Sequence, residues 1–176
     1  MNKSLILAAA AALLFSSPAF AQKVSVGSTD NDKTRDSVFV AAEYAKDTGF
    51  YDTQAVVEAR LRSSNQHFVK LGVQRELATD GVLSVSGRVN LVQDFGKNSG
   101  LGWSVEPTAA FKVADAKVTL GYEFGDTFKS DARARVRNAS VEVMYPVSFG
   151  DVGVLFESDI GDRREKSLSL VYVARQ

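Results

Sequence analysis

The stretch "KVTLGYEF", residues 117–124, alternates polar and apolar side chains with a period of two. On one side of an extended chain lie Val118, Leu120, Tyr122 and Phe124. On the other lie Lys117, Thr119, Gly121 and Glu123. Such alternation predicts a β-strand, but it does not say which face is buried. In a soluble sheet the apolar face is buried, whereas in a membrane-spanning barrel it meets lipid and the charges point inward.

The start of the chain has the features of a secretory signal peptide. Lys3 precedes an apolar run from Leu5 to Phe15, and Ala19-Phe20-Ala21 offers a small-residue cleavage site. We therefore expect cleavage to remove residues 1–21 and to leave residues 22–176 as a single domain. A transmembrane anchor is not expected, because the run is shorter than the roughly 20 residues that span a bilayer.

The composition excludes several classes of protein. There are 21 basic and 21 acidic residues, so the charge balance gives no indication of a nucleic-acid partner. The absence of cysteine excludes disulfides and thiolate metal sites, and a single histidine removes most zinc chemistry. No phosphate-binding or nucleotide motif is present. We expect neither a cofactor nor a metal.

The rest of the chain predicts an all-β protein, because period-two segments alternate with short turn signals and no long helical stripe occurs. The predicted strands are residues 23–28, 37–46, 53–63, 67–77, 81–93, 101–113, 116–125, 133–146, 150–159 and 166–175. One alternate set of connections is short, and the other is mostly longer and more charged. This asymmetry indicates an antiparallel up-and-down transmembrane β-barrel of about ten strands, eight being possible, with short turns and both termini on the periplasmic side.

The two faces of these strands favour charges inside the barrel. One face is apolar, and the other mixes charged residues with small ones such as Gly72 and Gly121. Long charged side chains cost nothing on a solvated face, whereas the crowded lumen of a narrow barrel needs small residues beside large ones. The residues predicted to face the lumen are Glu43, Glu58, Arg60, Lys70, Arg88, Glu106, Lys112, Glu123, Glu142 and Glu157. Opposite signs at similar depth predict ion pairs among them.

Aromatic residues gather toward the strand ends, as in the girdles of membrane barrels. They are Tyr44, Phe50, Tyr51, Phe68, Phe95, Trp103, Tyr145, Phe149 and Tyr172. With the export signal, the absence of cysteine and phrases such as "VTLGYEF", the chain resembles small Gram-negative outer-membrane β-barrel proteins, the porin-like group. The hairpin rhythm and the lumenal arginines also give a fainter similarity to small porins for acidic oligosaccharides.

Two features depart from that group. Its last strand usually ends in Phe or Trp, which the outer-membrane assembly machinery reads, whereas this chain ends Tyr172-Val173-Ala174-Arg175-Gln176. Pro107 falls inside a predicted strand and removes a ladder donor, which predicts a bulge or a local gap.

The functional expectation follows from the barrel. A structural barrel or a narrow porin-like channel for small solutes is expected, because a lumen of this size is nearly filled by side chains. The alternative is a soluble periplasmic or secreted lipocalin-like barrel, in which the apolar face lines a ligand cavity. No enzyme is expected, because the single histidine, His67, lies at a predicted strand end without a convergent set of catalytic groups.

Three arginines suggest a lipid partner. Arg133, Arg135 and Arg137 alternate in phase with the apolar face of the predicted strand 133–146. Because an arginine near the bilayer midplane costs about 2–4 kcal/mol, the run is expected at the membrane boundary. There the lipopolysaccharide phosphates suit the bidentate donors of arginine. Lipopolysaccharide binding is the hypothesis, with a solvated strand extension and a turn of the arginines into the lumen mouth as alternatives.

Overall fold

The computed structural model describes residues 23–31, 37–64, 67–95, 100–128, 136–160 and 165–174. The predicted signal peptide, residues 1–21, lies outside the described residues. No helix in the described part of the chain is long and apolar enough to cross a membrane.

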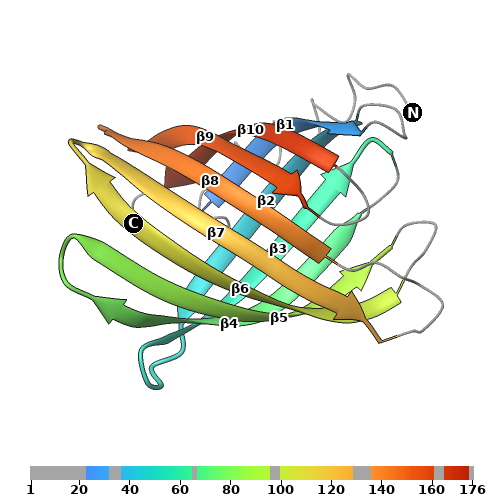
Figure 1. The fold of residues 1–176 in the computed structure, drawn as a ribbon, viewed down its shortest axis with the longest axis horizontal. Helices are drawn as coiled ribbons and strands as arrows, with labels where there is room; N and C mark the ends of the chain where they lie inside the picture. The colour runs from blue at the N-terminus through green and yellow to red at the C-terminus, as the bar shows by residue number, and fades with distance from the viewer. Residues whose placement is uncertain are drawn as a thin grey trace.

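Ten antiparallel strands close into one barrel, in which each strand pairs with its sequence neighbours and β1 pairs with β10 (Figure 1). The strands are β1 Lys23–Asn31, β2 Ser37–Asp47, β3 Thr53–Arg62, β4 Phe68–Thr79, β5 Leu83–Asp94, β6 Gly100–Val113, β7 Ala116–Thr127, β8 Val136–Val147, β9 Gly150–Asp159 and β10 Glu165–Ala174. The predicted all-β up-and-down barrel is confirmed, with ten strands rather than eight. The predicted strand bounds differ from these by a few residues at most.

The two ends of the barrel differ in their connections. The short connections 48–52, 80–82, 114–115 and 148–149 share one end, called here the turn end. β1 begins and β10 finishes at that same end, because Lys23 lies opposite Val173. The other five connections fall at the opposite end, called here the loop end. The alternation predicted from the sequence is therefore present.

The turns are stabilised by side-chain acceptors. Asp80 accepts hydrogen bonds from the backbone N–H groups of Val82 at 2.9 Å and Leu83 at 2.7 Å. These bonds favour the ionised form and lower the pKa of the Asp80 carboxyl below its usual value. Gly49 and Gly81 adopt positive φ angles of 68° and 84°, which glycine tolerates without a steric penalty.

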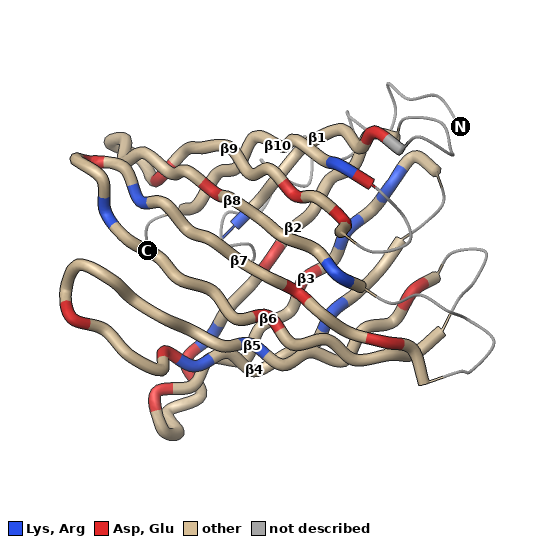
Figure 2. The backbone as a smooth tube through the Cα atoms, viewed as in Figure 1, with Lys and Arg blue, Asp and Glu red and all other residues tan. Residues whose placement is uncertain are grey.

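The polarity of the barrel is the reverse of that of a soluble protein. The buried set includes Arg60, Lys70 and Arg88, whereas Leu170 is 70% exposed on the outer face. In Figure 2 the charged positions are short interruptions in strands that otherwise carry uncharged residues. The interior is also crowded: a Cβ added at Gly72 would overlap the Asn90 side chain, and the side chain of Ser140 fills the space over Gly121. The charged face therefore lies inside, as the small residues on it predicted.

Pro107 causes a local gap and not a bulge. It pairs with Gly87 in β5, but pairing with β7 stops at Val105 and resumes at Thr108 in the same register. Of the two irregularities predicted at Pro107, a bulge or a local gap, the structure has the local gap. A register shift does occur elsewhere, between Glu76 and Ala78 in β4.

Exposed aromatic side chains gather at both ends of the outer face. The turn end has Phe50, Tyr51, Tyr145 and Phe149, and the loop end has Phe95, Trp103, Tyr122, Phe124 and Phe128. Between these girdles the outer surface is aliphatic. Phe68 was wrongly grouped with the girdles, because its ring lies inside the barrel, 5.2 Å from the Arg60 guanidinium carbon.

Candidate functional site in the lumen

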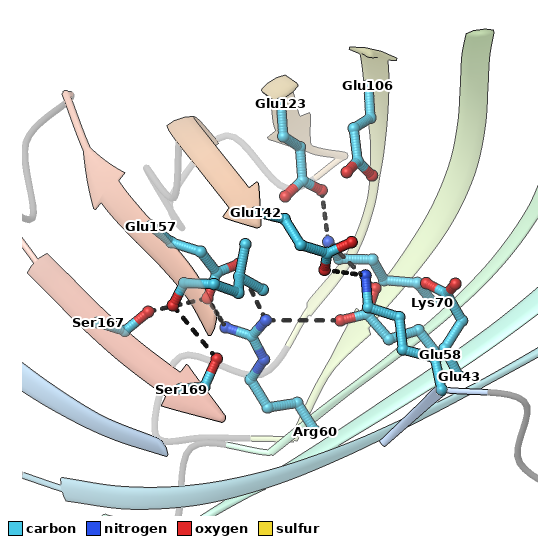
Figure 3. A network of polar contacts seen from close by, with 12 residues as sticks. Glu43, Glu58, Arg60, Lys70, Glu106, Glu123, Glu142, Glu157, Ser167 and Ser169 are labelled. Carbon is cyan, nitrogen blue, oxygen red and sulfur yellow. Dashed lines mark hydrogen bonds and ion pairs between the residues drawn. The ribbon is translucent and has the colours of Figure 1, made fainter. Parts of the chain in front are cut away.

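A bidentate ion pair crosses the lumen from β3 to β9. The two terminal nitrogens of Arg60 donate to the two carboxylate oxygens of Glu157 at 2.8 and 3.0 Å. Ser167 donates to the same carboxylate at 2.8 Å. The rings of Phe39 and Phe68 lie 4.7 and 5.2 Å from the Arg60 guanidinium carbon, so cation–π contacts add to the pair. Arg60 is therefore held from several directions (Figure 3).

A second ion pair crosses from β4 to β7. The Lys70 ammonium lies 2.7 Å from Glu123 and 3.7 Å from Glu58. Glu58 is also 3.7 Å from Arg60 and 3.3 Å from Arg88, so three cations share this one carboxylate. Figure 3 shows Lys70 between Glu123 and Glu58. The two crossing pairs are thus linked through Glu58.

Arg88 forms the third part of the network. Its guanidinium donates to Glu43 at 2.7 Å, to Glu58 at 3.3 Å and to Glu106 through both Nε and Nη2. Its side chain is only 8% exposed. An ion so deeply buried is stable only when its donors are satisfied, which these three carboxylates achieve.

Two further pairs lie nearer the ends of the barrel. Lys23 contacts Glu142 at 2.5 Å toward the turn end, and Arg62 contacts Glu165 at 2.5 Å toward the loop end. The ion pairs therefore extend along much of the lumen.

Two cavities occupy the lumen on either side of the crossing pairs. The turn-end cavity has a volume of about 470 Å³, and the loop-end cavity has a volume of about 100 Å³. Four residues line both cavities: Arg60, Lys70, Glu123 and Glu157. We call these four residues the partition, because they separate the two spaces with two ion pairs.

The wall of the turn-end cavity carries more acidic than basic side chains. Its basic residues are Lys23, Arg60, Lys70, Arg88 and Lys117. Its acidic residues are Glu43, Glu58, Glu76, Glu106, Glu123, Glu142 and Glu157. No aromatic side chain is among the residues that line it. In the described part of the chain, no group of three or more His, Asp or Glu side chains could hold a metal ion.

The structure brings nine of the ten residues predicted to face the lumen together around the turn-end cavity. Lys112 is the exception: it lies at the exposed end of β6 and lines neither cavity. The predicted set missed several charged residues that line the cavities: Lys23, Arg62, Glu76, Asp94, Lys117, Asp126, Asp159 and Glu165. For Arg62 the signal was the period of two itself, since it is in phase with Glu58 and Arg60.

His67 has a structural contact. Its Nδ1 accepts the backbone N–H of Arg62 at 3.2 Å, and its carbonyl accepts the N–H of Phe95 at 2.8 Å. The hydroxyl of Ser63, four residues before His67, accepts the backbone N–H of Val38 at 3.1 Å. These contacts join strand ends and fit the interpretation of His67 as a residue of the strand terminus.

Of the three arginines proposed to bind lipopolysaccharide, the structure describes one. Arg137 is exposed on the outer face of β8, opposite Phe124 of the loop-end girdle. Arg133 and Arg135 lie outside the described residues.

The closed sheet, the apolar outer face and the charged lumen define a small β-barrel of the transmembrane type. Solved porins share the fold. A KdgM porin aligns with a TM-score of 0.55 and 9% identity, covering 87% of this chain and 99% of its own. A KdgM porin in complex with disordered oligogalacturonate has a TM-score of 0.55 and 10% identity, with 88% and 99% covered.

The NanC porin aligns with a TM-score of 0.52 and 10% identity, covering 88% of this chain and 99% of its own. At such identities the likeness establishes the barrel architecture and not the solute. No protein-family model and no curated protein sequence matches the chain.

Proposed function

We propose that this protein is an outer-membrane barrel that acts as a narrow porin-like channel, constricted at mid-depth by the partition. The observation that carries the proposal is the pair of lumenal cavities that meet at Arg60, Lys70, Glu123 and Glu157. A purely structural barrel has no need of open space on both sides of a thin layer of charges. Charged side chains line both cavities, so the interior suits water and small polar solutes better than an apolar ligand.

The polarity of the two faces weighs against the lipocalin-like alternative. A barrel that holds an apolar ligand needs an apolar interior, whereas Arg60, Lys70 and Arg88 are buried here. The aliphatic outer face between two aromatic girdles fits the hydrocarbon layer of a membrane. Export by the predicted signal peptide, insertion by the outer-membrane assembly machinery and a passive, non-enzymatic role belong to the same proposal.

The two ion pairs of the partition differ in how firmly they are held. Glu157 binds Arg60 with two hydrogen bonds, and two aromatic rings flank the guanidinium. Lys70 meets Glu123 through one 2.7 Å contact at the end of a flexible stem, with one ring, Phe68, 5.2 Å away and Glu58 at 3.7 Å, so it has no bidentate pair. We therefore assign the Lys70–Glu123 side of the partition as the route by which solutes cross.

Conductance in planar bilayers tests the proposal. The wild-type protein should give small currents. The double variant Lys70→Ala/Glu123→Ala should raise the conductance several-fold, because it truncates both side chains that close this side of the partition. Removing both members of the pair also leaves no new uncompensated charge, so the barrel should stay folded. The matched control is Lys23→Ala/Glu142→Ala, another Lys–Glu pair that lines only the turn-end cavity. This control should raise the conductance much less.

Three outcomes would contradict it. Large, stable channels in the wild-type protein, or equal gains in the two double variants, would remove the partition as the constriction. No current in any of the three proteins would remove the channel itself.

A lipid partner is a separate proposal. Arg137 lies beside the loop-end girdle, where the predicted topology places the outer leaflet. A guanidinium at that depth suits a lipopolysaccharide phosphate. The sequence run Arg133, Arg135 and Arg137 is the proposed binding set.

A further inference from the structure

The charges of the lumen also bear on which solutes pass. Seven glutamates and five basic side chains line the turn-end cavity. Charged rings of one sign inside a pore attract ions of the opposite sign, and low-dielectric walls focus that field. The surplus of carboxylates therefore concentrates cations on the turn-end side of the partition.

The terminal nitrogens of the two arginines of this cavity already donate to glutamates of the protein. Both terminal nitrogens of Arg60 donate to Glu157, and two aromatic rings flank its guanidinium. Arg88 donates through Nε, Nη1 and Nη2 to three glutamates. A solute carboxylate is recognised best by the paired donors of a guanidinium, and here these are held by the protein's own carboxylates.

Two of the three lysines of this cavity follow the same pattern, whereas the third, Lys117, is exposed at the turn end. Lys70 is paired with Glu123 and Lys23 with Glu142. An anionic solute would have to displace these glutamates from a buried position, which leaves them without a counter-charge at a large cost. A cationic solute can instead share a glutamate, as three cations already share Glu58.

We propose that the lumen selects small cationic solutes over anions, including acidic saccharides. This inference rests on the proposed channel function and names its solute class. The proposed solute class differs from the acidic oligosaccharides that the fainter sequence similarity suggested. That similarity rested partly on the lumenal arginines, and in the structure Arg60 and Arg88 are paired with glutamates.

The test is the reversal potential in a potassium chloride gradient across a planar bilayer, measured with the Lys70→Ala/Glu123→Ala protein. That background removes one charge of each sign, so the surplus of carboxylates is retained. The potassium-to-chloride permeability ratio should exceed one. Adding Glu43→Gln and Glu76→Gln should bring the ratio close to one, because these changes neutralise two glutamates of the cavity wall. Glutamine can still accept the hydrogen bond that Ser84 donates to Glu76 at 2.7 Å.

The matched control is Asp52→Asn/Asp115→Asn in the same background. It removes two carboxylates from exposed turns at the same end of the barrel, and neither residue lines a cavity. Asp52 has a φ of 52°, a conformation that asparagine also adopts readily. The permeability ratio should stay as in the background protein, and added oligogalacturonate should leave the current unchanged.

Chloride preference, block by oligogalacturonate, or an equal shift in the turn control would overturn the cation proposal and leave the channel intact. The absence of any current in the Lys70→Ala/Glu123→Ala protein would overturn the proposed channel function, and the cation proposal with it.

Discussion

Arg88 and Val89 are neighbours in β5, yet they lie in opposite environments. Arg88 is 7% exposed and contacts three glutamates inside the barrel, whereas Val89 is 58% exposed on the outer face. Val89 pairs with Val73 and Val105 on the adjacent strands, which continue the aliphatic surface. The comparison teaches that in this fold the solvent for the apolar face is lipid, and that buried charges must satisfy one another.

The largest expected change in stability comes from a substitution inside the lumen. Arg88→Met removes a cation that three glutamates share. Glu58 keeps Lys70 and Arg60, but Glu43 and Glu106 lose their ion pair with Arg88 inside the lumen. A loss of roughly 3–5 kcal/mol in the free energy of unfolding is expected, as for a broken buried ion pair. Unfolding of the reconstituted protein in urea, followed by gel mobility without boiling, measures it.

A compensating variant sharpens the interpretation. Arg88→Met combined with Glu43→Gln and Glu106→Gln should regain much of the lost stability, because the two glutamates that lost their ion pair are neutralised and Glu58 still contacts Lys70 and Arg60. If Arg88→Met alone unfolds at the wild-type urea concentration, the ion network does not stabilise the barrel.

The next largest change in stability is expected from a charge placed on the outer, lipid-facing surface. Val89→Arg places a guanidinium near the middle of β5 on the outer face and should cost about 2–4 kcal/mol, the range for a cation at the midplane of a membrane barrel. Val89→Leu is the matched control and should fold like the wild type. The measurement is the same urea unfolding in lipid vesicles.

Solubility separates the two classes of barrel weighed from the sequence, because a lipocalin-like barrel would carry Val89 in its apolar cavity and would also be destabilised by Val89→Arg. The mature form of such a soluble barrel would stay in the aqueous phase without detergent. That result, or a Val89→Arg protein as stable as the wild type, would contradict the membrane interpretation.

The smallest effect concerns the boundary between the two environments. Charge reversal of Arg133, Arg135 and Arg137 to Glu should change the free energy of unfolding by at most about 1 kcal/mol per residue, because such costs are small near the interface. Co-purified lipopolysaccharide and heat stability in the outer membrane should nevertheless fall, because phosphate donors are lost.

A single-residue control tests position. Arg75 is an exposed arginine on the outer face of β4. It lies toward the turn end of the barrel, whereas Arg137 lies toward the loop end. Arg75→Glu should leave lipopolysaccharide binding unchanged, whereas Arg137→Glu should weaken it. Unchanged binding and heat stability in the triple variant would end the lipopolysaccharide proposal.

Much of the fold could be predicted from local patterns. All ten strands were predicted, because period-two alternation and turn residues are short-range signals that need no knowledge of distant contacts. Most lumen residues followed from the same phase. Phe68 could not be placed in this way: its aromatic character suggested a girdle, but its phase matches Lys70, and Arg60 lies against its ring.

The sequence by itself determined the strand order, the two faces and the inward direction of the charges. The order follows from hairpin-length connections, the faces from alternation along each strand, and the direction from the small residues that accompany the charges. Only the tertiary structure decided which charges meet, because pairs such as Arg60 with Glu157 join strands that are distant in the chain and adjacent only across the lumen. The partition, the occupied arginines and the two cavities are properties of barrel closure. They depend on how ten strands wrap around one axis, which the pattern of a single strand does not contain.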